Sequence, residues 1–239
     1  MKKELIKSNI VFKGIYTLYH VGTADIKNKS KNSYEGNGLS VSICPSAWCK
    51  IAKIGSSDVW ALKKSNMRLL DYYSLKDDVL DKITNWGIEN EYLEEVYVRY
   101  VYEYFDEELD RTVAVLCYDF KSALEETCEE TQYESYEDYL LNVEAEHRDI
   151  YPYKTYKATE KLRAKSLIDI PEGDMSKEQN FLIYIEENTD YDGVYWDDKF
   201  DILGLSAPRG VIFNSKIETF HKNKISWNEV DEITEEELY

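Results

Sequence analysis

The feature that most constrains the fold of this chain is the placement of its strand-like segments, which lie near both ends and flank an acidic middle. Residues 14–21, "GIYTLYHV", alternate apolar and polar positions and predict a strand. Further short β-like runs are "LSVSI" near the start and "DGVYW" and "RGVIF" near the end. The intervening "KSALEETCEETQYESYEDYLLNVEAEHRDIY" is acidic and favours one or two helices, closed by Pro152. The pattern predicts an α+β fold.

Length and local signals set the expected domain organisation. A chain of 239 residues can bury one sizeable core, although two small domains are also possible. We predict a single domain over 1–239 with a helical insertion at 120–165 and an acidic tail at 228–239. "SLKDDVLDKITNWGI" predicts a helix that ends at Gly87, and "EEVYVRYVYEYFDEELDRTVAVLCYDF" predicts two strands around an acidic turn, although the second half also suits a helix.

The formal net charge of −18 restricts the partners that the chain can bind. Such a field repels phosphates, so we do not expect stable non-specific nucleic-acid binding, although a nucleic-acid substrate in a locally basic cleft remains compatible. The acidity either keeps the protein soluble or serves to imitate nucleic acid and dock on a basic partner. The sequence contains no stretch of about twenty apolar residues, so we expect no membrane span. Four cysteines without zinc spacing predict no metal site and a reducing, cytoplasmic location.

The first candidate site residues lie in two strands near the start of the chain. His20 is expected at a strand end beside Tyr19 and Gly22, where an imidazole can donate hydrogen bonds to a ribose or phosphate. The alternative is a half-buried histidine satisfied by the backbone. Ser40 and Ser42 are two residues apart and therefore share one strand face. Their hydroxyls either fix a nucleotide or form the solvent side of an edge strand.

A second group of candidates lies near the end of the chain. Asp197 and Asp198 follow Trp196, and a carboxylate there could stabilise a developing positive charge or accept a proton. Asp192 is expected in a turn before a glycine. Arg209 could pair with one of these aspartates or bind a pyrophosphate as a fork. The alternative is a surface acidic loop with one structural salt bridge.

These motifs resemble those of a known superfamily. A strand ending in "YH", a glycine-containing loop, "GLSVS" and a following helix look like the nicotinamide pocket of ADP-ribosyltransferases. "YDGVYW" and "GVIFNSKIETF" are similar to the closing segment of many bacterial and phage members. The resemblance covers roughly residues 14–62 and 181–221. It implies a split, strongly bent antiparallel β core.

The resemblance also implies roles for individual residues. His20 would hold the ADP-ribose part of NAD, and Ser40 and Ser42 would support the nicotinamide ribose. Trp48, which is predicted to share a helix face with Ile51 and Ala52, would lie against nicotinamide. Members usually carry a glutamate just before the closing strand, where this chain has "APRG". Asp197, Asp198 or Asp192 would then supply the catalytic carboxylate.

The expected function is therefore NAD-dependent transfer of ADP-ribose to a protein or nucleic acid, by a toxin or a phage or defence effector, with an antitoxin or basic protein as a possible partner. The alternative is an inactive acidic module or inhibitor that docks on a basic partner. The first interpretation requires that the two ends of the chain fold together, so that His20, the two serines and a carboxylate meet.

Overall fold

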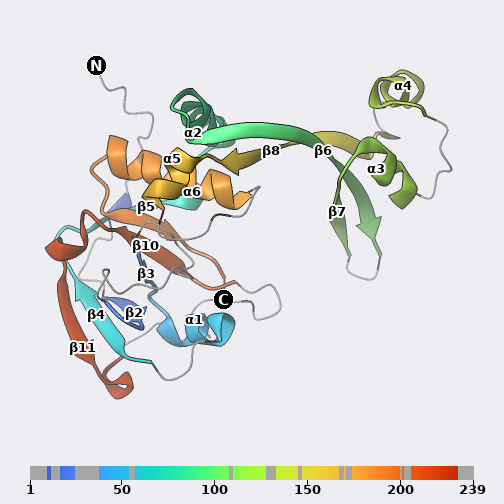
Figure 1. Ribbon diagram of the computed structural model, residues 1–239. Helices are drawn as coiled ribbons and strands as arrows, with labels where there is room; N and C mark the ends of the chain where they lie inside the picture. Colours follow the sequence, from blue (N-terminus) through green and yellow to red (C-terminus); the bar gives the residue numbers. More distant parts are fainter. Residues whose placement is uncertain are drawn as a thin grey trace. The chain divides into compact units, whose positions relative to one another are not determined.

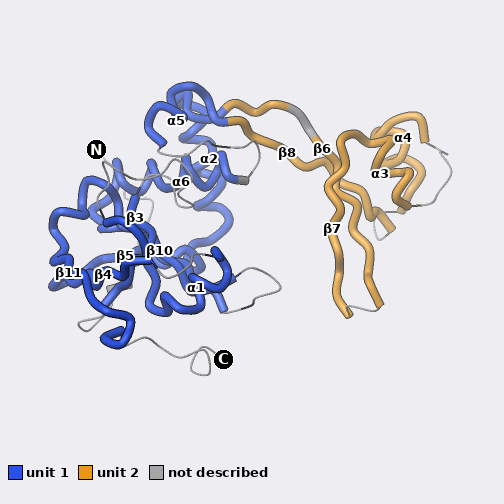
Figure 2. Tube along the Cα trace, turned by 60° about the horizontal axis from the view of Figure 1, so that its bottom comes forward, with its two compact units in different colours: residues 1–93, 158–171, 175–239 blue, residues 94–157, 172–174 orange. Residues whose placement is uncertain are grey.

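The computed structural model of the protein divides into two compact units. Its description covers residues 10–11, 17–24, 38–53, 57–107, 110–127, 133–144, 147–166, 170, 174–199, 201 and 206–230. The first unit comprises Met1–Leu93, Ala158–Pro171 and Met175–Tyr239, and the second comprises Glu94–Lys157 and Glu172–Asp174 (Figure 2). The fold is α+β with mostly antiparallel sheets, as the strand and helix signals predict. The second unit is thus an insertion into the first.

The described strands of the first unit form two sheets (Figure 1). One has the order β1-β5-β9-β10-β3 and the other the order β11-β4-β2. The strand bounds are β1 Ile10–Val11, β2 Leu18–Val21, β3 Gly38–Val41, β4 Val59–Lys63, β5 Arg68–Asp71, β9 Gly193–Trp196, β10 Arg209–Phe213 and β11 His221–Ile225. The neighbours pair antiparallel except β5 and β9, which run parallel. Residues 14–16 of the predicted first strand lie outside the described residues.

The two ends of the chain meet in the larger sheet, which confirms that part of the expectation. β3 pairs antiparallel with β10, with Ser40 opposite Val211 and Val41 opposite Gly210. The two sheets are joined where Tyr19 of β2 and Ser42 exchange backbone hydrogen bonds of 2.8 and 2.9 Å. Segments about 170 residues apart in sequence therefore lie side by side around this junction.

The core of the first unit has two layers, one on each face of the larger sheet. On one face, Val211 and Phe213 pack with Trp196 against the helices α2 (Asp77–Glu89) and α6 (Asp174–Asn188). On the other face, Leu39 and Ile212 pack against the smaller sheet. Alternate residues of each strand point to opposite faces, so β10 supplies both layers. Burial on both faces explains why "RGVIF" is almost continuously apolar.

One predicted boundary in the first unit is corrected, and one lies mostly outside the described residues. Gly87 does not end α2, because the helix continues to Glu89. A Cβ on Gly87 would lie 2.3 Å from the side-chain oxygen of Asn180 in α6, so the glycine permits close helix packing. Of the predicted acidic tail at 228–239, the described part ends at Val230 and begins inside the short 3-10 helix η5 (Trp227–Glu229).

The second unit combines a sheet with helices. Its described strands are β6 (Leu93–Asp106), β7 (Arg111–Cys117) and β8 (Ile150–Ala158), in the order β7-β6-β8. The helices α3 (Phe120–Glu126) and α4 (Tyr136–Asn142) lie between β7 and β8 in sequence. The β6–β7 hairpin confirms the two-strand prediction.

The helical insertion predicted at 120–165 requires correction, because residues 150–158 form strand β8 and only then does α5 (Glu160–Lys165) begin. Pro152 lies inside β8 rather than at a helix end. Since β8 is an edge strand of this sheet, the missing N–H of the proline is tolerated there. Among the described residues, no helix combines the length and apolarity needed to cross a membrane.

Candidate functional site

A pocket of about 180 Å³ lies between α1 (Pro45–Ala52) and the segment that enters β10. It is smaller than the roughly 300–1,000 Å³ typical of sites for drug-sized ligands, so it holds one ring rather than a whole dinucleotide. Its walls come from one face of α1, from the segment after β9 and from the segment that leads into β10. The lining residues are Trp48, Ile51, Ala52, Asp198, Ser206, Ala207 and Arg209.

The helix α1 brings Trp48 to the pocket together with Ile51 and Ala52, which confirms the predicted common face. Pro45 occupies the first helical turn, where its missing N–H costs nothing, and Lys53 ends the helix in the left-handed conformation. A half-buried Trp48 on a short helix presents an aromatic face next to the β10 segment.

The hydroxyl of Ser42 ties α1 to the opposite wall of the pocket. Ser42 is buried, donates to the carbonyl oxygen of Pro208 at 2.5 Å and accepts the N–H of Cys44 at 2.9 Å. It therefore links the start of α1 to the residue just before Arg209. In this arrangement the hydroxyl stabilises the pocket walls.

Arg209 enters the pocket from the first position of β10 and is held by three groups. Its Nε lies 3.5 Å from an Asp198 oxygen, and its Nη1 lies 3.6 Å from a Glu178 oxygen in α6. The guanidinium carbon sits 4.4 Å from the centre of the Trp196 ring. With its side chain 21% exposed, Arg209 is fixed in place yet reachable by a ligand.

Besides its ion pair with Arg209, Asp198 accepts a hydrogen bond from a residue that does not line the pocket. The hydroxyl of Tyr73, in the 3-10 helix η2 (Tyr72–Ser74), donates to Asp198 Oδ1. Desolvation of the hydroxyl and this hydrogen bond raise the pKa of Tyr73 to about 12. Tyr73 is therefore a neutral hydrogen-bond donor at physiological pH. The Asp198 carboxylate is thus oriented by Tyr73 and by Arg209.

Asp197 differs from its neighbour in environment. Partial burial raises the pKa of Asp197, and repulsion from Asp71 and Asp198 adds to the effect. As a whole residue, however, Asp197 is exposed, and it does not line the pocket. The carboxylates of Asp71, Asp197, Asp198 and Glu178 outnumber the single guanidinium of Arg209, so the surroundings of the pocket favour cationic ligands.

The residues predicted on the first strand lie at the junction of the two sheets. His20 is 8% exposed, and its Nδ1 and Nε2 lie 2.7 and 3.0 Å from the carbonyl oxygens of Ser40 and Thr23. Gly22 has φ = 121°, and its carbonyl accepts the indole N–H of Trp60 at 3.0 Å. Neither His20 nor Ser40 is among the described residues that line the pocket. His20 thus connects β2 to β3.

Tyr19 is also part of this junction rather than of the lining. It is 3% exposed and pairs through its backbone with Ser42. Of the predicted residues, the structure therefore brings Trp48, Asp198 and Arg209 together in one pocket. Ser42 links the pocket walls, whereas Tyr19, His20, Gly22 and Ser40 form the neighbouring sheet junction. The expected meeting of His20, both serines and a carboxylate around one ligand is therefore corrected, because the His20 ring is bonded to backbone carbonyls instead.

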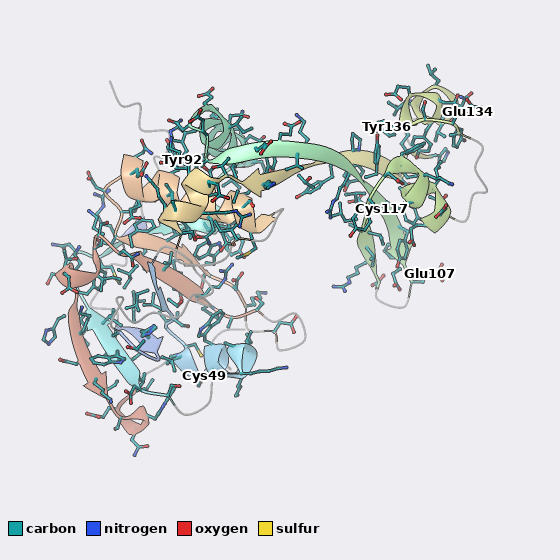
Figure 3. The ribbon with its side chains drawn as sticks, in the orientation of Figure 1. Cys49, Tyr92, Glu107, Cys117, Glu134 and Tyr136 are labelled. Carbon is teal, nitrogen blue, oxygen red and sulfur yellow. The ribbon has the colours of Figure 1, made fainter. Side chains whose placement is uncertain are left out.

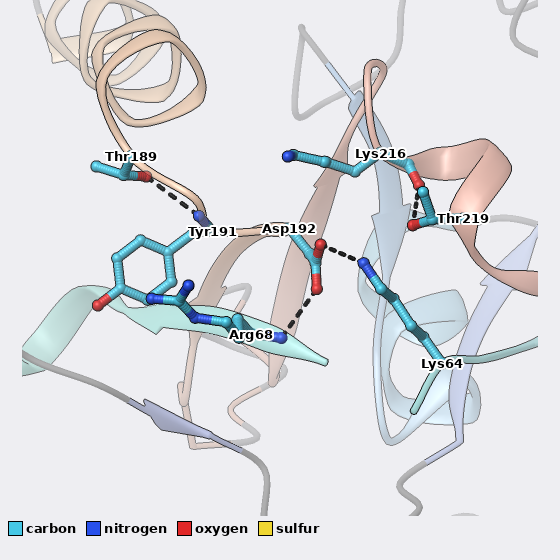
Figure 4. Close-up of polar contacts among 7 residues, drawn as sticks. All are labelled: Lys64, Arg68, Thr189, Tyr191, Asp192, Lys216 and Thr219. Carbon is cyan, nitrogen blue, oxygen red and sulfur yellow. Dashed lines mark hydrogen bonds and ion pairs between the residues drawn. The ribbon is translucent and has the colours of Figure 1, made fainter. Parts of the chain in front are cut away.

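Asp192 belongs to a separate structural ion pair (Figure 4). Its side chain is 5% exposed, one oxygen lies 2.6 Å from Lys64 Nζ, and the other accepts the N–H of Arg68 at 2.9 Å. These contacts fix the turn that leads into β9. The turn prediction for Asp192 is consistent with this position.

Sequence reasoning missed Tyr73 and Glu178 as members of the site. Tyr73 reaches Asp198 because β5 and β9 are parallel neighbours, so the segments that leave their carboxyl ends are adjacent. Glu178 reaches Arg209 because α6 covers the same sheet face. Nothing in the local sequence around either residue indicates such a long-range contact. In the described residues, no group of three or more His, Cys, Asp or Glu is arranged to hold a metal.

Comparison with protein-family models, characterised proteins and solved structures finds no match.

Proposed function

We propose that this chain binds NAD as a substrate, with the nicotinamide ring in the pocket, and transfers ADP-ribose to a macromolecular acceptor. The observation that carries the proposal is the convergence of Trp48, Asp198 and Arg209 from three separate segments on one ring-sized pocket. An aromatic face, a carboxylate and a guanidinium fork are the three groups that this reaction needs. The split, mostly antiparallel core, joined between β2 and the end of β3, supports a fold of the ADP-ribosyltransferase type.

The charge balance of the pocket agrees with the nicotinamide end of NAD rather than its adenylate end. The nicotinamide ring of NAD is cationic, and carboxylates outnumber the guanidinium around this pocket. The cation would lie against the Trp48 ring, where aromatic and cationic groups attract. The diphosphate would lie toward Arg209, which is partly exposed.

The reaction breaks the bond between the ribose C1′ and the nicotinamide nitrogen, and the bonding electron pair neutralises the pyridinium ring. Positive charge develops on the ribose, and the Asp198 carboxylate would stabilise it. A nucleophile of the acceptor then bonds to C1′ and loses its proton. Tyr73 and Arg209 hold the carboxylate in place. In this scheme His20 fixes the β2–β3 junction next to the site.

The test combines NAD binding with nicotinamide release. Replacing Trp48 with alanine should weaken NAD binding about tenfold, from the loss of one stacking contact. Asp198→Asn should lower the rate of nicotinamide release by about a hundredfold, with little effect on binding. Trp227→Ala and Asp58→Asn are the matched controls, because both lie in the first unit and outside the pocket lining. Equal release by Asp198→Asn and wild type would refute the assigned carboxylate.

The preference of the pocket for a cationic ring can be measured with two small ligands. The cation 1-methylnicotinamide should bind more tightly than neutral nicotinamide, and Trp48→Ala should weaken both. The reverse order of affinities would contradict nicotinamide placement in the pocket. If NAD neither binds nor releases nicotinamide, the alternative of an inactive module that docks on a basic partner takes its place.

A further inference from the structure

The second unit carries most of the excess acid of the chain. Residues 94–157 contain 18 acidic and 6 basic residues, a net charge of −12 out of −18 for the whole chain. The same segment contains 11 of the 21 tyrosines. Acidic and aromatic side chains are thus concentrated in one compact insertion, outside the unit that holds the pocket.

One face of the sheet in this unit is covered by its own helices. Tyr100 and Tyr102 of β6 and Cys117 of β7 pack with residues of α3 and α4 in one cluster. The Tyr100 ring lies 5.2 Å from the Tyr136 ring and 5.5 Å from the Phe120 ring, measured between centroids. Figure 3 labels Cys117 and Tyr136 in this part of the chain. This face forms the small core of the unit.

The opposite face bears aromatic and apolar side chains that the described residues leave exposed. Because alternate residues point to opposite faces, the register places Phe105 and Leu116 away from the helices. Phe105 is 59% exposed, Leu116 47% and Tyr118 77%. The Tyr118 ring has the guanidinium of Arg99, from the same face of β6, at 5.0 Å from its centre. We call Phe105, Leu116 and Tyr118 the outer face.

Carboxylates border the outer face. The Tyr151 hydroxyl donates to Glu103 at 2.6 Å, which holds that carboxylate on the face. Glu107 lies exposed in the turn at the end of the hairpin (Figure 3). An exposed apolar patch bordered by charged groups is typical of a protein-binding surface.

We propose that the outer face of the second unit docks a protein segment that presents lysine or arginine side chains beside apolar ones. Charge complementarity selects this occupant. A second copy of the chain would bring the charge of −12 of its own residues 94–157 against the same surface, and nucleic acid would bring phosphates. Cationic side chains would meet the aromatic rings and the bordering carboxylates together. This inference goes beyond NAD chemistry and does not rest on it.

The test uses the full chain and three synthetic helical peptides. A lysine–leucine peptide should bind, whereas lysine–serine and glutamate–leucine peptides should bind at least tenfold more weakly, since each lacks one of the two features. Leu116→Ser and Tyr118→Ser should each weaken the lysine–leucine peptide about five- to tenfold. Leu141→Ser is the matched control, because Leu141 is 85% exposed in α4 of the same unit. It should bind as wild type.

Three results would overturn the proposal. The first is equal binding of the lysine–serine and lysine–leucine peptides, or equal binding by the outer-face variants and wild type. The second is a dimer in sedimentation experiments that Tyr118→Ser dissociates, because a second copy would then be the occupant. The third is slow maleimide labelling of Leu116→Cys compared with Leu141→Cys in the absence of peptide. That result would mean that the chain itself covers the face.

Discussion

The ion pair between Lys64 and Asp192 gives a quantitative prediction about the stability of the first unit. Lys64→Met removes the ammonium group and keeps an unbranched apolar side chain, which can still pack on Phe220. The Asp192 carboxylate, 5% exposed, would then keep the Arg68 N–H but lose its cation. Removing one partner of a buried pair costs about 3–5 kcal/mol. Because Lys64 is 22% exposed, we expect the lower end, about 3 kcal/mol.

The reverse substitution should cost less. Asp192→Asn keeps an oxygen that can accept the Arg68 N–H, and it leaves behind a lysine that reaches water. We expect a loss of about 1–2 kcal/mol. At roughly 2–4 °C per kcal/mol for a unit of this size, Lys64→Met should lower the melting temperature by about 6–12 °C and Asp192→Asn by about 2–8 °C.

The assay is urea unfolding followed by tryptophan fluorescence. The tryptophans at positions 48, 60, 86, 196 and 227 all belong to the first unit, so their signal follows that unit alone. The double variant should lose less than the sum of the two single variants, because the second change removes an already unpaired partner. If Asp192→Asn costs as much as Lys64→Met, the reasoning from unequal burial is refuted.

Three further predictions concern other parts of the first unit. Ser42→Ala leaves two buried backbone groups without their partner, so urea unfolding should show a loss of about 1–3 kcal/mol, and an unchanged midpoint would contradict this. Gly193→Ala would put a Cβ 1.8 Å from the carbonyl oxygen of Val211, so soluble yield and melting temperature should fall sharply; a variant as stable as wild type would disprove the strand spacing. Burial and neighbouring carboxylates raise the pKa of Asp197, so the folded chain binds this proton more tightly than the unfolded chain, and the associated stability is lost as pH rises through the raised pKa. Asp197→Asn should therefore melt about 1–2 °C above wild type at pH 7 and lose this advantage at pH 3, which melting curves at both pH values would check.

Local patterns in the sequence were sufficient for several elements. The spacing of Trp48, Ile51 and Ala52 predicted the helix α1 and the face that lines the pocket. The aromatic-rich run before an acidic turn and the apolar run after it predicted the β6–β7 hairpin. The helix and the hairpin depend on contacts between residues close in sequence, so local sequence patterns are enough to predict them.

Other features depended on tertiary contacts that local sequence does not encode. Gly87 stays inside α2 because Asn180 of another helix packs against it, and Pro152 is tolerated because β8 is an edge strand. Tyr73 reaches Asp198 only through the parallel pairing of β5 with β9. In the candidate site, the residues on one helix face and in one acidic run were predictable, whereas their partners from distant segments were not.

The insertion of the second unit also bears on how the chain folds during synthesis. Thr159, just after β8, donates its N–H to the carbonyl oxygen of Tyr92 at 3.1 Å and its hydroxyl to that of Glu91 at 2.7 Å, so the two junctions lie together. Closing a flexible loop as long as residues 94–157 would cost roughly 4 kcal/mol of chain entropy. If the insertion folds on the ribosome before β9 and β10 emerge, that ordering is complete before the larger sheet assembles. A second unit that folds early would then hold its two junctions together and so speed the folding of the first unit.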